Sequence, residues 1–264
     1  MKRLAAAHEH LDGPLTDEDV LAGNLRDLRR LNRFLGGVSL SRHAIDALVL
    51  EQHLPDEPPM RLIDVGTGGA DIPLALLEAW GKRGRRLSVT AVDSRPEVLG
   101  AASVLHPAIA NEADLRLEVA DGRQLPFADG AFDVAHASLV LHHLEPGDAA
   151  LLVREMSRVG RKGVVINDLS RGWLTWLGAW LILHLITRNR FTLDDGPLSV
   201  RRAYTIAEAR QLVAQAGLRV VHQEVGFAGH RWAIAAVAED RQPEGEAGVR
   251  ESGVAASPTR GLPS

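Results

Sequence analysis

The 264-residue chain contains no cysteine. This absence excludes disulfide bonds, thiolate metal sites and a cysteine nucleophile, and it fits a cytoplasmic protein. Aromatic residues make up only 4% of the chain, with a single tyrosine, Tyr204. No apolar run reaches the roughly 20 residues that a membrane span needs. The first residues are basic but meet charged side chains before any apolar core develops, so we expect no signal peptide.

The chain also lacks a strong charge of either sign. Lys and Arg number 30 against 34 Asp and Glu, for a formal net charge of -4. Binding to a polyanion needs a cationic face, so this balance argues against a general nucleic-acid partner. A hydrophobic fraction of 45% and a charged fraction of 24% are ordinary for a globular protein. The length suits one α/β domain with an accessory helical element.

Two helices are predicted before residue 57. The first begins at Thr16, which can cap it, and its leucines recur at three-to-four spacing until Gly36-Gly37 end the run. The second covers about Ser41 to His53, ahead of Leu54-Pro55. We therefore expect an N-terminal helical cap over residues 1–57.

Residues 58–239 alternate between short apolar segments and helical segments. The segments expected to be strands are Arg61–Val65, Leu87–Val92, Leu115–Ala120, Phe132–Ala137 and Gly163–Asp168. Helices are expected between them near Ile72–Trp80, Pro96–Leu105 and Gly147–Val159. This order predicts an α/β fold with a Rossmann-like, doubly wound sheet whose strands are mostly parallel.

The end of the chain predicts one more helix and an antiparallel hairpin. Thr205 and Glu208 form a capping box, and Gly217 ends the helix that follows. Leu218–Val225 and Arg231–Ala238 are expected to be strands, and their short glycine-containing connection makes them antiparallel. Residues 240–264 hold few large apolar side chains, so we expect a disordered tail.

A glycine-rich turn follows the first expected strand, at Gly66-Thr67-Gly68-Gly69-Ala70-Asp71. Glycines allow a sharp turn and a close ligand approach, and the helix that follows offers free N–H groups. A dinucleotide fingerprint would need a third glycine where Asp71 stands, and a carboxylate there would face a pyrophosphate. The turn therefore favours a cofactor without phosphates.

From this turn onward the chain resembles the class I S-adenosylmethionine-dependent methyltransferases, over roughly residues 58 to 170. Asp64, Gly66 and Gly68 match the first motif of that family, and Ala70 replaces its last glycine. Further matches are Asp93 after the second strand, Asp121-Gly122 after the third, and Leu141-His142-His143-Leu144 after the fourth. The chain is most similar to the small-molecule branch typified by the ubiquinone and menaquinone methyltransferases.

The resemblance implies S-adenosylmethionine as the cofactor and gives roles to the matching residues. Asp93 would accept hydrogen bonds from both ribose hydroxyls, and Asp121 would lie near the adenine edge. The full set of cofactor-binding residues expected in this way is Asp64, Gly66, Thr67, Gly68, Asp93, Ser94, Asp121, Gly122 and Ser138.

Methyl transfer from a sulfonium rests mostly on holding the acceptor in line and in a dry site, with a base where the acceptor must lose a proton. The candidate catalytic residues are His142, His143 and Asp168, at strand ends on the ligand-binding edge. His136 lies inside a strand and is expected to be a core histidine. His230 and Arg231 on the last hairpin could border the acceptor site, but a solvated turn is expected. No metal site is expected, including at His8 and His10.

Residues 173–187 form the most unusual stretch of the sequence. Trp173, Trp176 and Trp180 share one face of a predicted helix that is apolar nearly all round. Three explanations stay open: a helix packed on the sheet or on a second copy, a lid at about residues 171–204 that lines a lipophilic acceptor pocket, and peripheral membrane contact through these tryptophans.

Nucleic-acid methylation is disfavoured. An amino-methylating DNA enzyme of this type carries an Asn/Asp/Ser-Pro-Pro-aromatic motif where this chain reads Ala137-Ser138-Leu139-Val140, and a cytosine C5 enzyme needs a cysteine. We therefore expect methyl transfer to oxygen or carbon of a hydrophobic small molecule, such as a phenol, a quinone precursor or a polyketide-like acceptor. The alternatives are a small-molecule N-methyltransferase and a non-catalytic, cofactor-binding interaction or membrane-surface module. The expected location is cytoplasmic, with or without peripheral membrane contact, and the oligomeric state is open.

Overall fold

The computed structural model describes residues 1–5, 7, 9–13, 17–55 and 57–239. The tail expected at 240–264 and the cap expected at Thr16 lie outside these residues. Within them, no helix is both long enough and apolar enough to cross a bilayer.

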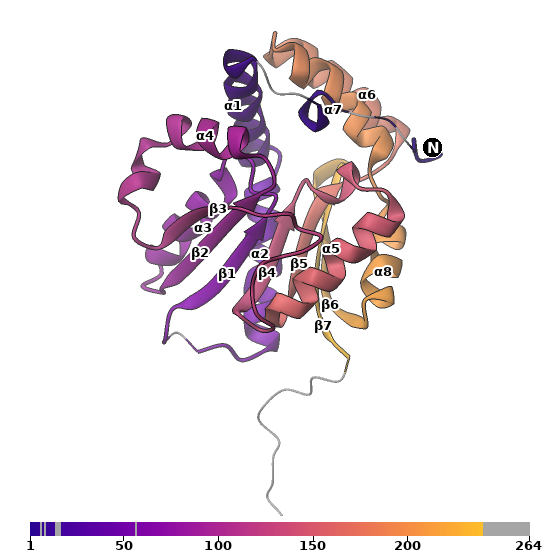
Figure 1. The fold of residues 1–264 in the computed structure, drawn as a ribbon. Helices are drawn as coiled ribbons and strands as arrows, with labels where there is room; N and C mark the ends of the chain where they lie inside the picture. The colour runs from indigo at the N-terminus through magenta and orange to yellow at the C-terminus, as the bar shows by residue number, and fades with distance from the viewer. Residues whose placement is uncertain (6, 8, 14–16, 56, 240–264) are drawn as a thin grey trace, which may run out of the picture.

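A seven-stranded sheet with the order β3-β2-β1-β4-β5-β7-β6 forms the middle layer (Figure 1). The strands are β1 (Met60–Val65), β2 (Leu87–Asp93), β3 (Leu115–Val119), β4 (Phe132–Ser138), β5 (Gly160–Leu169), β6 (Leu218–Val225) and β7 (Arg231–Ala238). The first five pair in parallel, while β7 runs antiparallel to both β5 and β6. The expected Rossmann-like sheet with an antiparallel last strand is confirmed.

Two helix starts follow local chemistry, whereas the second helix begins at Gly37, earlier than the expected Ser41. The helices are α1 (Glu18–Phe34), α2 (Gly37–Glu51), α3 (Asp71–Gly81), α4 (Pro96–Leu105), α5 (Pro146–Val159), α6 (Trp173–Ile186), α7 (Arg190–Arg202) and α8 (Ile206–Gln215). The Asp17 side chain caps α1 by accepting from the Val20 N–H. Thr205 and Glu208 form the predicted capping box of α8.

Alternating strand residues build two cores, one on each face of the sheet. On one face, Ile63 and Val65 pack in a cluster that includes the apolar sides of α5 and α8. On the other face, Leu62 packs in a cluster that includes α2 and α3. Because both faces are covered, the open edge at the carboxyl ends of the parallel strands is the natural place for a ligand.

Helix α7 is the element that the sequence did not predict. Pro197 stands in its interior, where proline removes a backbone hydrogen bond and normally breaks a helix. The neighbouring Gly196 allows α7 to pack against α6, since a Cβ on this residue would lie 2.1 Å from Leu183 of α6. The missing side chain lets α6 and α7 pack closely.

Three helices lie over the carboxyl edge of the sheet. Helices α1, α6 and α7 form a roof above the strand ends (Figure 1). A small apolar cluster ties part of this roof together, with Leu21 and Leu25 of α1, Val98 of α4 and Phe191 of α7. The space between roof and sheet is the site described next.

Candidate functional site

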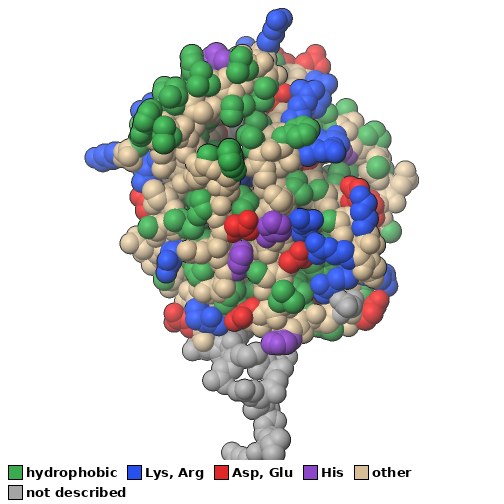
Figure 2. Space-filling view, turned by 180° about the vertical axis from the view of Figure 1, so that it is seen from behind, with side chains coloured by type: hydrophobic (Ala, Val, Ile, Leu, Met, Phe, Trp, Pro, Cys, Tyr) green, Lys and Arg blue, Asp and Glu red, His purple; other side chains and the backbone are tan. Residues whose placement is uncertain are grey.

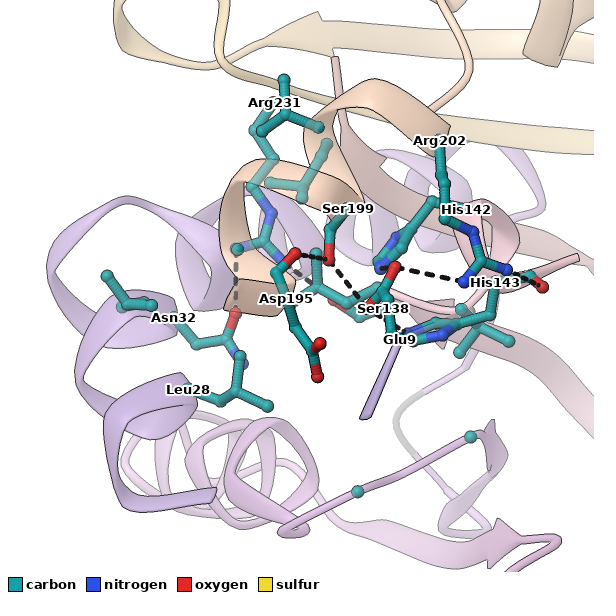
Figure 3. A pocket seen from close by; sticks show the side chains of 18 of the residues that line it. Glu9, Leu28, Asn32, Ser138, His142, His143, Asp195, Ser199, Arg202 and Arg231 are labelled. Carbon is teal, nitrogen blue, oxygen red and sulfur yellow. Dashed lines mark hydrogen bonds and ion pairs between the residues drawn. The ribbon is translucent and has the colours of Figure 1, made fainter. Parts of the chain in front are cut away.

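A cavity of about 1050 Å³ lies between the roof and the strand ends (Figure 3). This volume is at the upper end of the range for small-molecule sites, so it has room for a large cofactor together with a second molecule. Its walls come from the glycine-rich turn, the ends of β2 and β4, the helices α1, α6 and α7, and the β6–β7 hairpin.

The glycine-rich turn forms one part of the cavity wall. Gly66 and Gly68 have left-handed backbones, with φ of 70° and 56°, and Ala70 adopts φ 56° immediately before α3. A Cβ on Gly66 would lie 2.4 Å from the Val140 side chain, whereas a Cβ on Gly68 would meet nothing within 4 Å. Gly68 thus borders open space in the cavity. Ala70 adopts a left-handed conformation that favours glycine.

Thr67 presents a polar group to the same cavity. Its hydroxyl oxygen is buried and has no hydrogen-bond partner in the described part of the chain. Buried polar groups are nearly always hydrogen-bonded, so this hydroxyl calls for a bound ligand or water. Ser94 and Ser138 also line the cavity.

Asp93 and Asp121 line the same cavity, as the expected cofactor site requires. The Asp93 carboxylate accepts the Gly68 N–H at 3.0 Å and the Arg95 N–H at 3.1 Å, and burial raises its pKa. Asp121 is more exposed, and hydrogen bonds from Arg123 lower its pKa. Next to it, a Cβ on Gly122 would clash with Val65 and Leu152.

Asp64 behaves differently from the other residues expected to bind the cofactor. It is buried beneath the cavity and is not among the residues that line it. One carboxylate oxygen lies 2.5 Å from Nδ1 of His136, whose Nε2 lies 2.8 Å from the Ser41 hydroxyl. The structure therefore places Asp64 under the glycine-rich turn, where it holds the core histidine His136.

His142 and Asp168 form a buried pair at the cavity. Nδ1 of His142 lies 2.6 Å from one carboxylate oxygen of Asp168, and the His142 N–H donates to the other at 3.1 Å. Burial alone would raise the pKa of Asp168, but the charge and hydrogen bonds of His142 outweigh it and lower this pKa. A carboxylate on Nδ1 fixes the ring, and Nε2 lies 4.0 Å from a carboxylate oxygen of Glu9.

His143 lies beside this pair and belongs to a second polar cluster. Its Nδ1 lies 2.8 Å from the Asp12 carboxylate, and its Nε2 lies 3.8 Å from Glu9. Burial would lower the pKa of His143, but Glu9 and Asp12 overcome this and raise it to about 9. His143 is therefore a cation at neutral pH and lacks the free lone pair that a general base needs.

The N-terminal segment supplies site residues that the sequence gave no reason to select. Glu9, which is 4% exposed, precedes the short helix η1 (His10–Asp12) and lies against α7. Its carboxylate accepts from the Ser199 hydroxyl at 2.8 Å and from the Arg202 guanidinium at 3.4 Å. Arg202 also donates to Asp12 at 2.5 Å. These contacts draw residues 9–12 into the cavity wall.

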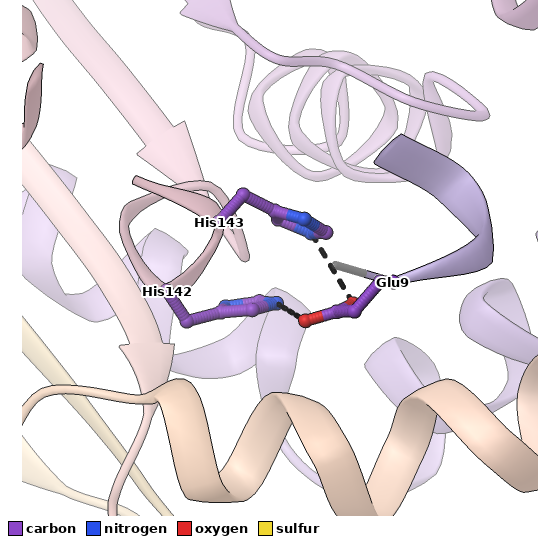
Figure 4. Close-up of side chains that lie close together, drawn as sticks. All are labelled: Glu9, His142 and His143. Atoms are coloured by element: carbon purple, nitrogen blue, oxygen red, sulfur yellow. Dashed lines mark ion pairs between the residues drawn. The ribbon is translucent and has the colours of Figure 1, made fainter. Parts of the chain in front are cut away.

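Glu9, His142 and His143 are also a group that could hold a metal ion (Figure 4). They come from distant parts of the chain, and their ligand atoms lie within 4.8 Å of one another. The cluster is already balanced without a metal, because Arg202 contacts Glu9 and a protonated His143 faces both Glu9 and Asp12. The absence of a metal site therefore stays our prediction.

The expectation that Arg231 lies in a solvated turn is wrong. Arg231 is only 2% exposed, because it begins β7 and its side chain turns inward toward the strand ends. Its guanidinium donates to Asn167 at 2.9 Å. It also donates to Asn32 at 2.8 Å and to Ser138 at 3.1 Å (Figure 3). Arg231 thereby joins three separate elements at one side of the cavity.

Helix α6 presents different faces to the cavity and to the outside. Its inner face lines the cavity with Leu174, Thr175, Gly178, Ala179, Ile182 and Leu183. Trp173 is 64% exposed and Trp180 is 41% exposed, and neither lines the cavity. Figure 2 shows hydrophobic side chains gathered at the upper left, over this helix. The lid interpretation thus applies to the small and aliphatic residues of α6, while the tryptophans face outward.

The central part of the chain, from β1 to β5, matches a known protein family. Residues 63–166 match the model of a methyltransferase domain. An uncharacterized methyltransferase of Synechocystis is 25% identical over 178 residues, which cover 64% of this chain and 78% of the relative. The demethylmenaquinone methyltransferase of Thermus thermophilus is 32% identical over 136 residues, or 51% of this chain and 56% of that protein.

A solved structure has the same fold. A methyltransferase structure from Aquifex aeolicus superposes with a TM-score of 0.56 at 18% identity, covering 81% of this chain and 97% of that one. At this identity the likeness concerns the fold alone. The matched family region runs from β1 to β5 and includes the glycine-rich turn and both aspartates that end β2 and follow β3.

Proposed function

We propose, since the chain belongs to the class I S-adenosylmethionine-dependent methyltransferases, that it transfers the methyl group to an oxygen or carbon atom of a hydrophobic small molecule. A phenol, a quinone precursor or a polyketide-like compound has the required chemistry. The observation that carries the proposal is that His142, held by the buried Asp168, lines the same cavity as apolar residues of α1 and α6.

The residues around the glycine-rich turn fit the cofactor. The unpartnered Thr67 hydroxyl and the open space beside Gly68 form a cradle for the methionyl part. Each carboxylate oxygen of Asp93 accepts one backbone N–H and keeps a lone pair for a ribose hydroxyl. When bound, the cofactor supplies an already activated methyl group on a sulfonium.

The protein's task is then to place the acceptor atom and remove its proton. His142, which lines the cavity and is oriented by Asp168, is the group we assign to proton removal. The leucines of α1 and the aliphatic residues of α6 exclude water from the acceptor. His143 is assigned to the structural ion-pair cluster, since its proton is held by Asp12 and Glu9.

A small-molecule N-methyltransferase is the second candidate. The carboxylate of Asp195, which lines the cavity, favours a cationic amine over a neutral acceptor. A cell extract incubated with enzyme and cofactor, and analysed by mass spectrometry for molecules that gain one methyl group, separates the candidates by the identity of the product. Cofactor binding without any methylated product in broad extracts would support the non-catalytic module instead.

The inner face of α6 offers a test of the lid. Gly178 lines the cavity, and a Cβ on it would meet nothing within 4 Å. Gly178→Leu should therefore occupy acceptor space and raise KM for long acceptors at least fivefold more than for short ones. Trp180→Ala, on the outer face of the same helix, is the matched control and should leave both KM values near wild type. An equal effect of Gly178→Leu on long and short acceptors would contradict the lid.

Two further assignments accompany this proposal. The division into an N-terminal cap (1–57) and a cofactor-binding domain (58–239) follows the sequence pattern. Peripheral membrane contact through Trp173, Trp176 and Trp180 is consistent with the exposure of Trp173 and Trp180. Binding of the protein to anionic liposomes, compared with a Trp173→Ala/Trp180→Ala variant, tests that contact, and equal capture of both proteins would rule it out.

A further inference from the structure

Arg231 is a buried cation whose direct partners are all uncharged. Its guanidinium donates to the amide oxygens of Asn167 and Asn32 and to the hydroxyl of Ser138. Within the described residues, no carboxylate oxygen lies within ion-pair distance of it. Buried charges are usually paired, because removing an ion from water is costly. The carboxylates of Asp168 and Asp71 act on this charge from beyond ion-pair distance, so the guanidinium lacks a direct anionic partner.

The surroundings of Arg231 are built to hold the guanidinium in place. Asn32 donates its own NH₂ to Asp71 at 3.0 Å, and Asn167 donates its NH₂ to the Gly37 carbonyl at 2.8 Å. Both amides are thereby oriented with their oxygens toward Arg231. A Cβ on Gly37 would lie 2.6 Å from the guanidinium, so only glycine leaves room for it there. These uncharged contacts orient the guanidinium and leave it without a direct ion pair.

The guanidinium has donors to spare. It carries five N–H groups in a planar fork, and the hydrogen bonds to Asn167, Asn32 and Ser138 use one each on Nε, Nη1 and Nη2. One N–H therefore remains on each terminal nitrogen. Arg231 also lines the cavity. A carboxylate is the group that matches a guanidinium fork, and an ionised hydroxyl can accept from one arm of it.

The location of Arg231 points to the acceptor as the source of that anion. The residues expected to hold the adenosyl group follow β1, β2 and β3, whereas Arg231 begins β7, which is separated from β1 by β4 and β5. Other residues of the β6–β7 hairpin, Phe227 and His230, line the same part of the cavity. The hairpin thus contributes to the half of the cavity away from the ribose aspartate.

We propose that Arg231 is a specificity-determining residue that binds an anionic oxygen of the acceptor, either a carboxylate or an ionised hydroxyl. Together with the apolar walls of α1 and α6, it selects an amphiphilic acid: one anionic end against Arg231 and a hydrophobic body beneath the lid. This inference rests on the proposed function, because it names the acceptor class of the same cavity. Burial lowers the pKa of Arg231 to about 10, so the side chain remains a cation at neutral pH.

The test uses a matched pair of probes, octylbenzoate and octylbenzamide, which differ in charge but little in shape. Isothermal titration calorimetry in the presence of S-adenosylhomocysteine should show that the wild-type protein binds the anion at least tenfold more tightly than the amide. Arg231→Met should remove this preference, and Arg231→Lys should keep part of it. Arg188→Met, at an exposed arginine beyond α6, is the control and should keep all of it.

Two results would overturn the inference. One is equal binding of octylbenzoate and octylbenzamide by the wild-type protein. The other is weaker binding of S-adenosylhomocysteine, but not of methylthioadenosine, by Arg231→Lys, because only the first carries the methionyl carboxylate. Methyl transfer to anionic acceptors at an unchanged rate in Arg231→Met would leave the proposed function intact and remove this inference. A protein that prefers the anion but methylates no acceptor would support this inference and contradict the proposed function.

Discussion

Replacing Asp93 by alanine removes the carboxylate that we assign to the ribose hydroxyls. In the folded protein each of its oxygens already accepts one backbone N–H, from Gly68 and from Arg95, and keeps a lone pair toward the cavity. Hydrogen bonds to a charged acceptor contribute about 1.5–3 kcal/mol. The expected loss of affinity for S-adenosylhomocysteine is therefore about tenfold to 150-fold.

Calorimetric titration of S-adenosylhomocysteine measures this loss directly. Glu118→Ala is a suitable control, because Glu118 is an exposed carboxylate on the adjacent strand β3, outside the cavity. Since Asp93 also restrains the Gly68 N–H, thermal unfolding of both variants checks that the fold is retained. An affinity of the folded Asp93→Ala variant equal to wild type would refute the ribose assignment.

Further predictions concern catalysis, stability and metal. Asp168→Asn should lower kcat by about 10²–10⁴ with little change in cofactor affinity, because His142 loses the carboxylate that orients it; an unchanged pH–rate profile and kcat would exclude His142 as the base. The raised pKa of His143 gives stability that is complete below pH 6.5 and is lost as pH rises through about 9. His143→Gln should therefore flatten this part of the pH dependence of the free energy of unfolding, by roughly 3 kcal/mol at most, as chemical denaturation at several pH values can show. Gly66→Ala should lower the free energy of unfolding by about 1–3 kcal/mol more than Gly68→Ala, because both strain a left-handed backbone but only the first meets Val140; equal losses would contradict the role given to that contact. Activity should survive dialysis against a chelator, and a loss restored by added zinc or manganese would show that a metal is required.

Local chemistry was enough to predict the sheet and the glycine-rich turn. Short apolar segments separated by amphipathic ones have few ways to bury both kinds of surface, and a parallel sheet covered by helices is the simplest. The glycine-rich turn could be located because Gly66 and Gly68 adopt backbones that few other residues tolerate. The capping box at Thr205 fixed the start of α8 for a similar reason, since both of its hydrogen bonds are local.

The parts that the sequence did not predict depend on contacts between distant segments. Glu9 and Asp12 lie in a short irregular segment whose sequence carries no periodic signal, and they are placed by Arg202 and His143, far along the chain. A proline such as Pro197 would ordinarily break a helix, but the packing of α6 on α7 overrides this effect. The burial of Arg231 could not be predicted, because its uncharged partners come from three elements that are distant in the sequence.

The two-sided character of α6 has a consequence for how this protein can change. Under the proposed function its inner residues shape the acceptor space, whereas the glycine-rich turn and the aspartates that end β2 and follow β3 belong to other elements. Substitutions at Gly178 or Ile182 can therefore alter which molecules enter without disturbing how the methyl donor is held. Substitutions confined to one face of α6 would then be enough to change the acceptor specificity of the protein.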